Sequence, residues 1–227
     1  MSVIENYRSL EKEISRIANS SGSRGDVTII AVSKTFPPEV VQQAIDAGIS
    51  LFGENKVQEA KKKIPVLRGN FCFHMIGHLQ SNKAKDAVRL FDLIHSIDKI
   101  ETAQAVNIEA HKIEKKQKIL IQVNTSGEES KSGVTPERAP QLVEEILKLD
   151  NVELLGLMAM APFTDNRDVI RNVFIKTREL MKQINSGLGT ELRELSMGMS
   201  SDYDIAVEEG ATMVRIGAAL FGERRYS

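Results

Sequence analysis

Residues 192–217 read LRELSMGMSSDYDIAVEEGATMVRIG. Two short apolar runs, Leu192–Met197 and Met213–Ile216, enclose an amphipathic segment at Asp202–Glu209 that is followed by Gly210. Glycine commonly follows the last residue of a helix, so the pattern indicates a strand, a helix and a second strand. A helix between two strands is the usual connection between parallel strands. This stretch therefore predicts a parallel sheet.

The same alternation recurs upstream along the chain. Six further predicted strands are Val27–Val32, Ser50–Phe52, Phe71–Ile76, Leu93–Ser96, Ile119–Val123 and Val152–Met158. The predicted helices between the strands are Pro38–Ala47, Lys56–Leu67, Asn82–Phe91, Ile100–Lys116, Pro136–Leu149 and Asp168–Ser186. Eight such units after a charged N-terminal helix predict an α/β fold, a single (β/α)₈ TIM barrel, with residues 1–227 as one domain. An open doubly wound sheet has the same local pattern and remains the alternative.

Composition and charge exclude several classes of protein. Of 227 residues, 41% are hydrophobic, which is enough for a packed core and argues against a disordered chain. Thirty basic and 31 acidic residues give a net charge of -1, which argues against a nucleic-acid binder that relies on a positive field. The N-terminus does not resemble a secretory signal, and the longest apolar stretch, Leu154–Phe163, is too short to cross a membrane. Cys72, the single cysteine, is expected to be a small buried apolar residue, and the protein is expected to be cytoplasmic.

In a barrel of this kind, functional side chains gather after the strand ends. Ser200 follows the seventh strand and Gly217 follows the eighth. The loops at these two places commonly bind phosphate through hydroxyl and backbone N–H groups. Ser200 and the amides around Gly217 therefore predict a phosphate site.

Two basic residues stand at strand ends. Lys34 follows the first strand, where partial desolvation would lower its pKa and expose a neutral amine able to form a Schiff base. The alternative is a lysine that reaches water from the strand end. Arg215 ends the eighth strand and would either hold a ligand or brace a loop.

Other charged residues carry weaker signals. The four histidines, His74, His78, His95 and His111, lie on separate segments without spaced carboxylate partners, so no metal site is predicted. The lysine runs Lys61–Lys63 and Lys112–Lys118 fall on predicted helices, where solvated faces are expected.

Seven sequence blocks resemble one known family. They are AVSKT at 31–35, FGENKVQE at 52–59, HMIGHLQSNK at 74–83, SKSG at 130–133, GLMAM at 156–160, LSMGMSSD at 195–202 and VRIG at 214–217. Together they resemble the pyridoxal 5′-phosphate (PLP) homeostasis protein family, from about residue 27 to residue 223. That family is similar to the N-terminal barrel of alanine racemase and of eukaryotic ornithine decarboxylase.

The resemblance implies a role for each of five residues. Lys34 would be the lysine in covalent Schiff-base linkage to PLP. Ser200 and the amides near Gly217 would hold the phosphate, and Asn55 would line the cofactor. Arg215 would face the pyridine nitrogen or reach the phosphate. No catalytic residue is implied.

The family binds, buffers and delivers PLP inside the cell, so PLP-dependent apoenzymes are the implied partners. The loop around Lys131 would lie over the barrel mouth, where this lysine either attracts the phosphate or is simply solvated. One departure is Phe36, which stands where family members often carry a second lysine.

Three functions compete: a PLP carrier without turnover, a PLP-dependent amino-acid racemase, and a phosphate-binding barrel enzyme without a cofactor. A two-base racemase needs an acid–base group on each face of the cofactor. Tyr203, just after the phosphate loop, is the tyrosine best placed in sequence for that role, although it is expected nearer the phosphate. The carrier is the function that the sequence favours.

Overall fold

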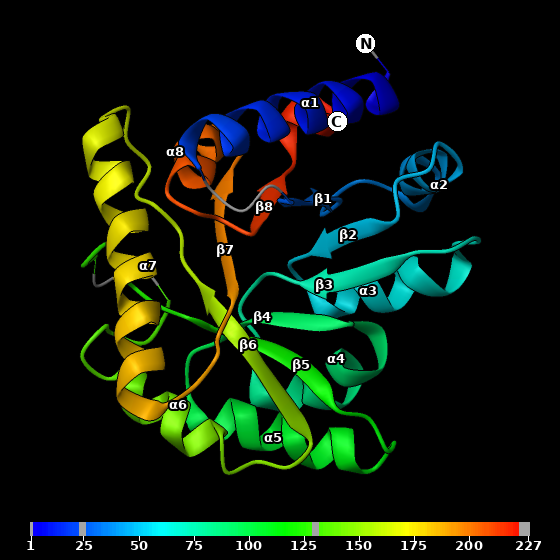
Figure 1. The fold of residues 1–227 in the computed structure, drawn as a ribbon. Helices are drawn as coiled ribbons and strands as arrows, with labels where there is room; N and C mark the ends of the chain where they lie inside the picture. Colours follow the sequence, from blue (N-terminus) through cyan, green and yellow to red (C-terminus); the bar gives the residue numbers. More distant parts are fainter. Residues whose placement is uncertain (1, 23–25, 129–131, 223–227) are drawn as a thin grey trace.

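The eight strands close into a barrel in chain order, each parallel to its neighbours (Figure 1). The computed structural model describes residues 2–22, 26–128 and 132–222. The strands are β1 (Thr28–Val32), β2 (Leu51–Glu54), β3 (Cys72–Met75), β4 (Leu93–Ile97), β5 (Gln117–Gln122), β6 (Val152–Met158), β7 (Glu194–Met199) and β8 (Met213–Ile216). The first strand pairs with the last, from Thr28 opposite Met213 to Ala31 opposite Ile216. This pairing confirms the predicted (β/α)₈ barrel, because every strand has two neighbours, whereas an open sheet ends in two edge strands.

Helices follow the strands and surround the barrel (Figure 1). They are α1 (Val3–Ser21), α2 (Pro38–Asp46), α3 (Val57–Lys63), α4 (Ala84–Leu90), α5 (Ile100–His111), α6 (Ala139–Ile146), α7 (Arg167–Leu188), α8 (Tyr203–Glu208) and α9 (Ala218–Phe221), with short 3₁₀ helices η1 (Ile64–Val66) and η2 (Ser81–Lys83). The expected N-terminal helix is α1, which begins at a capping box between Ser2 and Glu5 and packs against α8 and α9. Across the described ranges, none of these helices combines the length and apolar character needed to pass through a lipid bilayer.

Prolines explain two differences from the predicted helix boundaries. The helix predicted at Pro136–Leu149 begins only at Ala139, with Pro140 in its first turn, where a missing N–H costs no hydrogen bond. The helix predicted at Lys56–Leu67 changes to a 3₁₀ turn at Ile64, next to Pro65. The short helix α9 was not predicted, because four residues are too few for a periodic pattern.

Side chains that alternate along the strands build two apolar layers. Ile29 and Ala31 of β1 belong to the large cluster between strands and helices, whereas Ile30 points into the barrel. The inner cluster comprises Ile30, Leu93, Leu120, Met158 and Met213. Two residues after Leu93 of β4 and Met213 of β8, toward the carboxyl ends of these strands, the buried side chains are the polar His95 and Arg215. This change from apolar to polar side chains marks the functional end of the barrel.

The structure corrects the expectation for Cys72, whose side chain is exposed rather than buried. Phe71 and Phe73 share one face of the strand and contact each other edge-on, with ring centroids 5.7 Å apart. Cys72 lies between them and faces the opposite side, because side chains alternate along a strand. It is the first residue of β3, at the end of the barrel away from the site.

Candidate functional site

The five predicted site residues gather on one sector of the barrel rim. Lys34 follows β1, Asn55 follows β2, Ser200 follows β7, Arg215 lies in β8, and Gly217 follows β8. These four strands are consecutive around the closed barrel, because β8 pairs with both β7 and β1 and β1 pairs with β2. A Cβ atom added to Gly217 would lie 3.6 Å from the Cβ of Val32, so the ends of β8 and β1 lie side by side.

Two backbone amides converge on the hydroxyl of Ser200. The N–H groups of Gly217 and Ala219 each donate to Ser200 Oγ at 3.2 Å. We call these three groups the Ser200 cradle. Amides that point at one acceptor at the start of a helical turn are typical of anion sites, so the arrangement fits a phosphate group.

The guanidinium of Arg215 lies inside the barrel, with 4% of the residue exposed. Nη1 donates to the carbonyl oxygen of Ser196 at 2.7 Å and to its hydroxyl at 2.6 Å, and Nη2 donates to the carbonyl oxygen of Ala159 at 2.9 Å. All three acceptors are neutral. Burial lowers the pKa of Arg215 to about 10, and the more distant Asp202 only partly opposes that change. Buried cations are normally paired, so this one favours an electron-rich partner at the site.

Two buried histidines extend this contact across the barrel. His95 Nδ1 lies 2.9 Å from Ser196 Oγ, and His95 Nε2 lies 3.0 Å from His74 Nδ1. Arginine can only donate, so the Ser196 hydroxyl accepts from Arg215. Its own hydrogen and its second lone pair allow the contact with His95 Nδ1 in either direction, according to the tautomer of His95. Desolvation lowers the pKa of His74 to about 4 and that of His95 well below the usual value, which keeps both rings neutral.

This chain of hydrogen bonds was not predicted, because the histidines stand on different segments of the sequence. The alternation of inward-facing and outward-facing side chains along each strand could have predicted it. His95 comes two residues after the inward-facing Leu93, and Arg215 comes two residues after the inward-facing Met213. Polar residues at these inward positions therefore had to meet inside a closed barrel.

Asn55 and Gly77 show how closely the backbone packs at the end of β2. A Cβ atom on Gly77 would fall 2.2 Å from the carbonyl oxygen of Asn55, so only glycine fits there. The side-chain Oδ1 of Asn55 is buried and has no hydrogen-bond partner within the described chain. A buried acceptor without a donor is costly, and a ligand that supplies a donor would remove that cost.

A buried ion cluster lies beside the turn that carries Lys34. Lys63 Nζ donates to Glu54 Oε1 at 2.6 Å, to Glu59 Oε1 at 2.9 Å and to the carbonyl oxygen of Ser33 at 2.9 Å. The Ser33 hydroxyl also donates to Glu54 Oε1, at 2.7 Å. We call Ser33, Glu54, Glu59 and Lys63 the Lys63 cluster. Burial raises the pKa of Glu54, and the contact with Lys63 opposes that change.

Lys63 corrects the expectation that the run Lys61–Lys63 is solvated. Lys61 and Lys62 are exposed, but the Lys63 side chain is only 3% exposed. Successive residues turn by about 100° around a helix, so Lys63 faces the barrel when Lys61 faces water. In the second run, Lys112 and Lys116 are exposed, while Lys115 donates to the carbonyl oxygens of Val88 and Phe91.

Other predicted features lie away from the rim sector. Tyr203 donates its hydroxyl hydrogen to Glu13 of α1 at 2.9 Å. Lys131 falls outside the described residues. Within the ranges that the structure describes, no three histidine, cysteine or acidic side chains are grouped as a metal ion would require.

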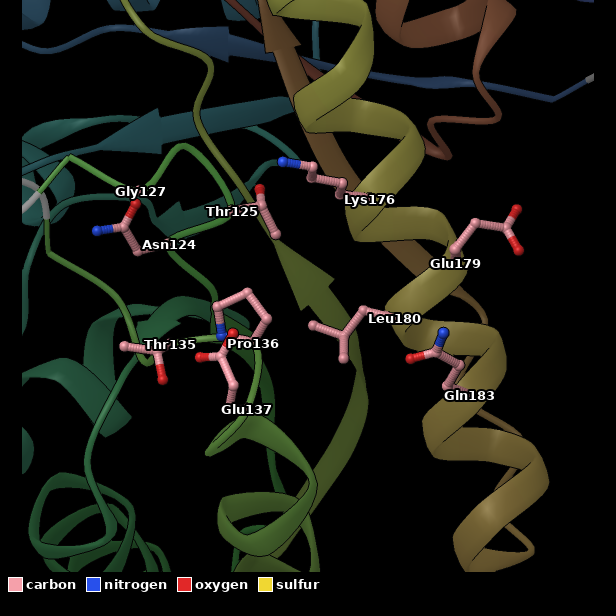
Figure 2. Close-up of a pocket in the computed structure, with 10 residues that line it drawn as sticks. All are labelled: Asn124, Thr125, Gly127, Thr135, Pro136, Glu137, Lys176, Glu179, Leu180 and Gln183. Atoms are coloured by element: carbon pink, nitrogen blue, oxygen red, sulfur yellow. The ribbon is translucent and has the colours of Figure 1, made fainter.

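A separate cavity of about 550 Å³ opens between the loop after β5, the start of α6, and α7 (Figure 2). Leu180 points across it toward Pro136, and Glu179 points away from it. Its lining residues are Asn124, Thr125, Gly127, Thr135, Pro136, Glu137, Lys176, Glu179, Leu180 and Gln183. None of the five predicted site residues lines this cavity, so the candidate site is the rim sector around Lys34.

Comparisons with known proteins identify relatives of this chain. Residues 6–225 match the family described as alanine racemase, N-terminal domain. The pyridoxal phosphate homeostasis protein of Aquifex aeolicus is 41% identical over all of both chains. The structure of PipY from Synechococcus elongatus with PLP bound has a TM-score of 0.86 and 34% identity, covering 97% of this chain and 100% of that one.

Alanine racemase from Clostridium difficile shares the fold alone. It has a TM-score of 0.76 at 18% identity and is covered over 58% of its length. The identity with full-length relatives, and the match to the racemase domain over nearly the whole chain, are far above what fold similarity alone requires. The chain therefore belongs to the pyridoxal phosphate homeostasis protein family, which is built on the barrel of the alanine racemase N-terminal domain.

Proposed function

We propose that this protein binds PLP at the rim sector, holds it covalently on Lys34, and delivers it to PLP-dependent apoenzymes without turnover of its own. The observation that carries the proposal is the pairing of β8 with β1. This pairing sets the Ser200 cradle beside the strand that Lys34 follows. An amine and an anion site on adjacent strands fit a phosphorylated aldehyde.

Each site residue has a definite task in this proposal. The Ser200 cradle holds the phosphate, and Lys34 attacks the aldehyde carbon, so that a C=N bond forms and water leaves. Asn55 lines the cofactor and offers its unpaired Oδ1 to a donor. Pyridoxal chemistry depends on the ring acting as an electron sink.

Arg215 suits the ring nitrogen better than the phosphate. Its hydrogen bonds run to β6 and β7 inside the barrel, whereas the Ser200 cradle uses the loops after β7 and β8. A charged guanidinium facing the pyridine nitrogen disfavours a proton there, which makes the ring a poor electron sink. A site of this kind holds the cofactor without being equipped for carbanion chemistry.

A racemase would need a second acid–base group besides Lys34. Tyr203, the tyrosine best placed in sequence, is turned toward Glu13 of α1. Relatives that share full length with this chain are named homeostasis proteins, and the PipY structure holds PLP. We further propose that residues 1–227 act as one PLP-binding domain in the cytoplasm, where the free thiol of Cys72 stays reduced.

Borohydride reduction tests the attachment directly. The purified protein, incubated with PLP, is expected to absorb in the visible range and to carry one pyridoxyl group on Lys34 after reduction and peptide mass spectrometry. Lys34→Ala should lose the group, and the exposed Lys61→Ala should retain it. Equal labelling of Lys34→Ala would overturn the assignment.

Delivery is tested by mixing the loaded protein with a PLP-dependent apoenzyme and following the activity that returns. Transfer is expected to occur with a rate that depends on apoenzyme concentration. A recovery rate set only by spontaneous release of free PLP would argue against direct delivery.

A further inference from the structure

We propose that Glu59 and Lys63 are positioning residues that fix the backbone on both sides of Lys34 and thereby set the direction of its amine. This inference rests on the proposed function of Lys34. Glu59 and Lys63 belong to α3 and lie outside the rim sector.

Both peptide groups that flank Lys34 are tied to the same cluster. On the amino side, Lys63 Nζ donates to the carbonyl oxygen of Ser33 at 2.9 Å. On the carboxyl side, the N–H of Thr35 donates to Glu59 Oε1 at 2.6 Å. Lys63 and Glu59 themselves pair at 2.9 Å. One ion pair therefore spans the residue that carries the reactive amine.

Thr35 explains why the turn needs such a contact. Its φ is 70°, in the left-handed region that β-branched residues rarely adopt. A residue held there costs on the order of 1–3 kcal/mol and persists only when surrounding contacts impose the conformation. The carboxylate of Glu59 is such a contact, because a hydrogen bond to a charged acceptor is stronger than a neutral one.

Stability alone does not account for the Lys63 cluster. The side chains of Lys63 and Glu54 are 3% and 0% exposed, and Glu54 Oε2 has no partner among the described residues. Burying two charges costs several kcal/mol per ion, and an apolar pair of similar size is often as stable. The charged groups instead fix the positions of the Ser33 carbonyl and the Thr35 N–H through directional hydrogen bonds.

The opposite side of the same turn is fixed by aromatic packing. Phe36 contacts Phe221 of α9, with ring centroids 4.9 Å apart and an interplanar angle of 33°. The helix α9 begins next to the Ser200 cradle. The turn is therefore held between α3 and α9, so the Lys63 cluster aligns the amine and Phe36 keeps the turn close to the cradle.

The test compares two ligands that differ only at the reacting carbon. PLP uses both the cradle and Lys34, whereas pyridoxine 5′-phosphate carries an alcohol in place of the aldehyde and cannot bond to the amine. Binding is measured for the wild type, Glu59→Ala, the double variant Glu54→Gln/Lys63→Met, and Lys61→Met. The double variant removes both buried charges together, so that neither is left unpaired.

If Glu59 and Lys63 position Lys34, both cluster variants should bind PLP about tenfold or more weakly, which corresponds to the strain released at Thr35. The visible absorbance of bound PLP should shift as well. Binding of pyridoxine 5′-phosphate should stay within about twofold, because it does not use the amine. Lys61→Met, an exposed lysine of the same helix, should match the wild type for both ligands.

Equal weakening for both ligands, or unchanged PLP binding and spectrum in folded cluster variants, would overturn the inference. Circular dichroism and melting temperature show whether each variant is folded. The two proposals fail in different ways. A wild type without PLP on Lys34 overturns both, whereas a labelled wild type with unaffected cluster variants overturns only this one.

Discussion

The guanidinium of Arg215 donates to the hydroxyl of Ser196 at 2.6 Å, across neighbouring strands inside the barrel. The same hydroxyl lies 2.9 Å from His95 Nδ1, so one side chain bonds to both buried groups. The side chain of Ser196 is thus the connection between the arginine and the histidine pair.

Ser196→Ala should therefore cost stability and alter cofactor binding. It leaves His95 Nδ1 without its hydrogen-bond partner and removes one acceptor of Arg215, and an unsatisfied buried polar group costs about 1–3 kcal/mol. We expect the free energy of unfolding in urea to fall by that order and the absorbance of bound PLP to shift. Ser186→Ala, an exposed control in α7, should change the unfolding free energy by less than about 0.5 kcal/mol. A Ser196→Ala protein as stable as this control would contradict the hydrogen-bonded chain.

The neutral histidines predict a loss of stability in mild acid. The pKa of His74 is lowered from 6.5 to about 4, chiefly by burial, while Asp92 raises it and Lys118 lowers it. Below pH 6.5 the His74 side chain binds a proton in the unfolded chain but stays neutral in the native state. The free energy of unfolding is therefore highest above pH 6.5 and decreases as the pH falls to about 4.

The loss from His74 should amount to about 3 kcal/mol, and the direction for His95 is the same. Urea unfolding measured from pH 7.5 to 4 checks this expectation. In His74→Gln the slope of unfolding free energy against pH should decrease over this range. An identical slope in wild type and variant would show that His74 binds its proton over the same pH range in the native and unfolded states, which contradicts a lowered pKa.

Gly77→Ala should damage the site through the backbone of Asn55. The new Cβ would fall 2.2 Å from the Asn55 carbonyl oxygen, so the backbone at the end of β2 has to move. We expect PLP binding to weaken about tenfold or more and the melting temperature to fall, since overpacking costs about 1–3 kcal/mol. Gly187→Ala in α7 is the matched control, because nothing lies within 4 Å of its added Cβ. If both alanines behaved alike, the close approach at Gly77 would have no role in the site.

Tyr203 gives the test that separates a carrier from a racemase. Its hydroxyl is held by Glu13, and burial together with that carboxylate raises its pKa to about 12. Tyr203→Phe is therefore expected to bind PLP as the wild type does. In D₂O the wild type should exchange and invert the Cα position of alanine far more slowly than about 1 s⁻¹. Inversion at that rate or faster, lost in Tyr203→Phe, would favour the racemase.

Periodicity was sufficient to predict the alternation of strands and helices, because each βα unit carries its own pattern, and the number of units favoured a barrel over an open sheet. Val152–Met158 and Met213–Ile216 were predicted with the bounds that the structure gives. β8 is buried along its whole length and β6 from Gly156 to Met158, so each leaves a mostly apolar run in the sequence. The short helix α9 was not predicted, because its four residues carry too little periodic pattern.

The site residues were predicted from their positions after the strands. The buried residues that contact and orient them were not predicted. Lys34 and Gly217 stand directly after strand patterns, so topology alone brings them together. Lys63 lies in the middle of a lysine run, and its burial depends on which side of α3 faces the barrel. His74 and His95 are 21 residues apart, and only the closed barrel brings them into contact.

The site can form during synthesis only after β8 has been made and has paired with β1. The Ser200 cradle and its neighbour β1 come from opposite ends of the chain, and α1 bonds to the last helix through Asn6, whose Nδ2 donates to the Leu220 carbonyl oxygen at 2.9 Å. While the ribosome is still making β8, the edge of β1 has no partner and is open to pairing with other chains. The contacts that complete the site are thus among the most distant in sequence, which predicts slow folding and a need for protection of the nascent β1 edge.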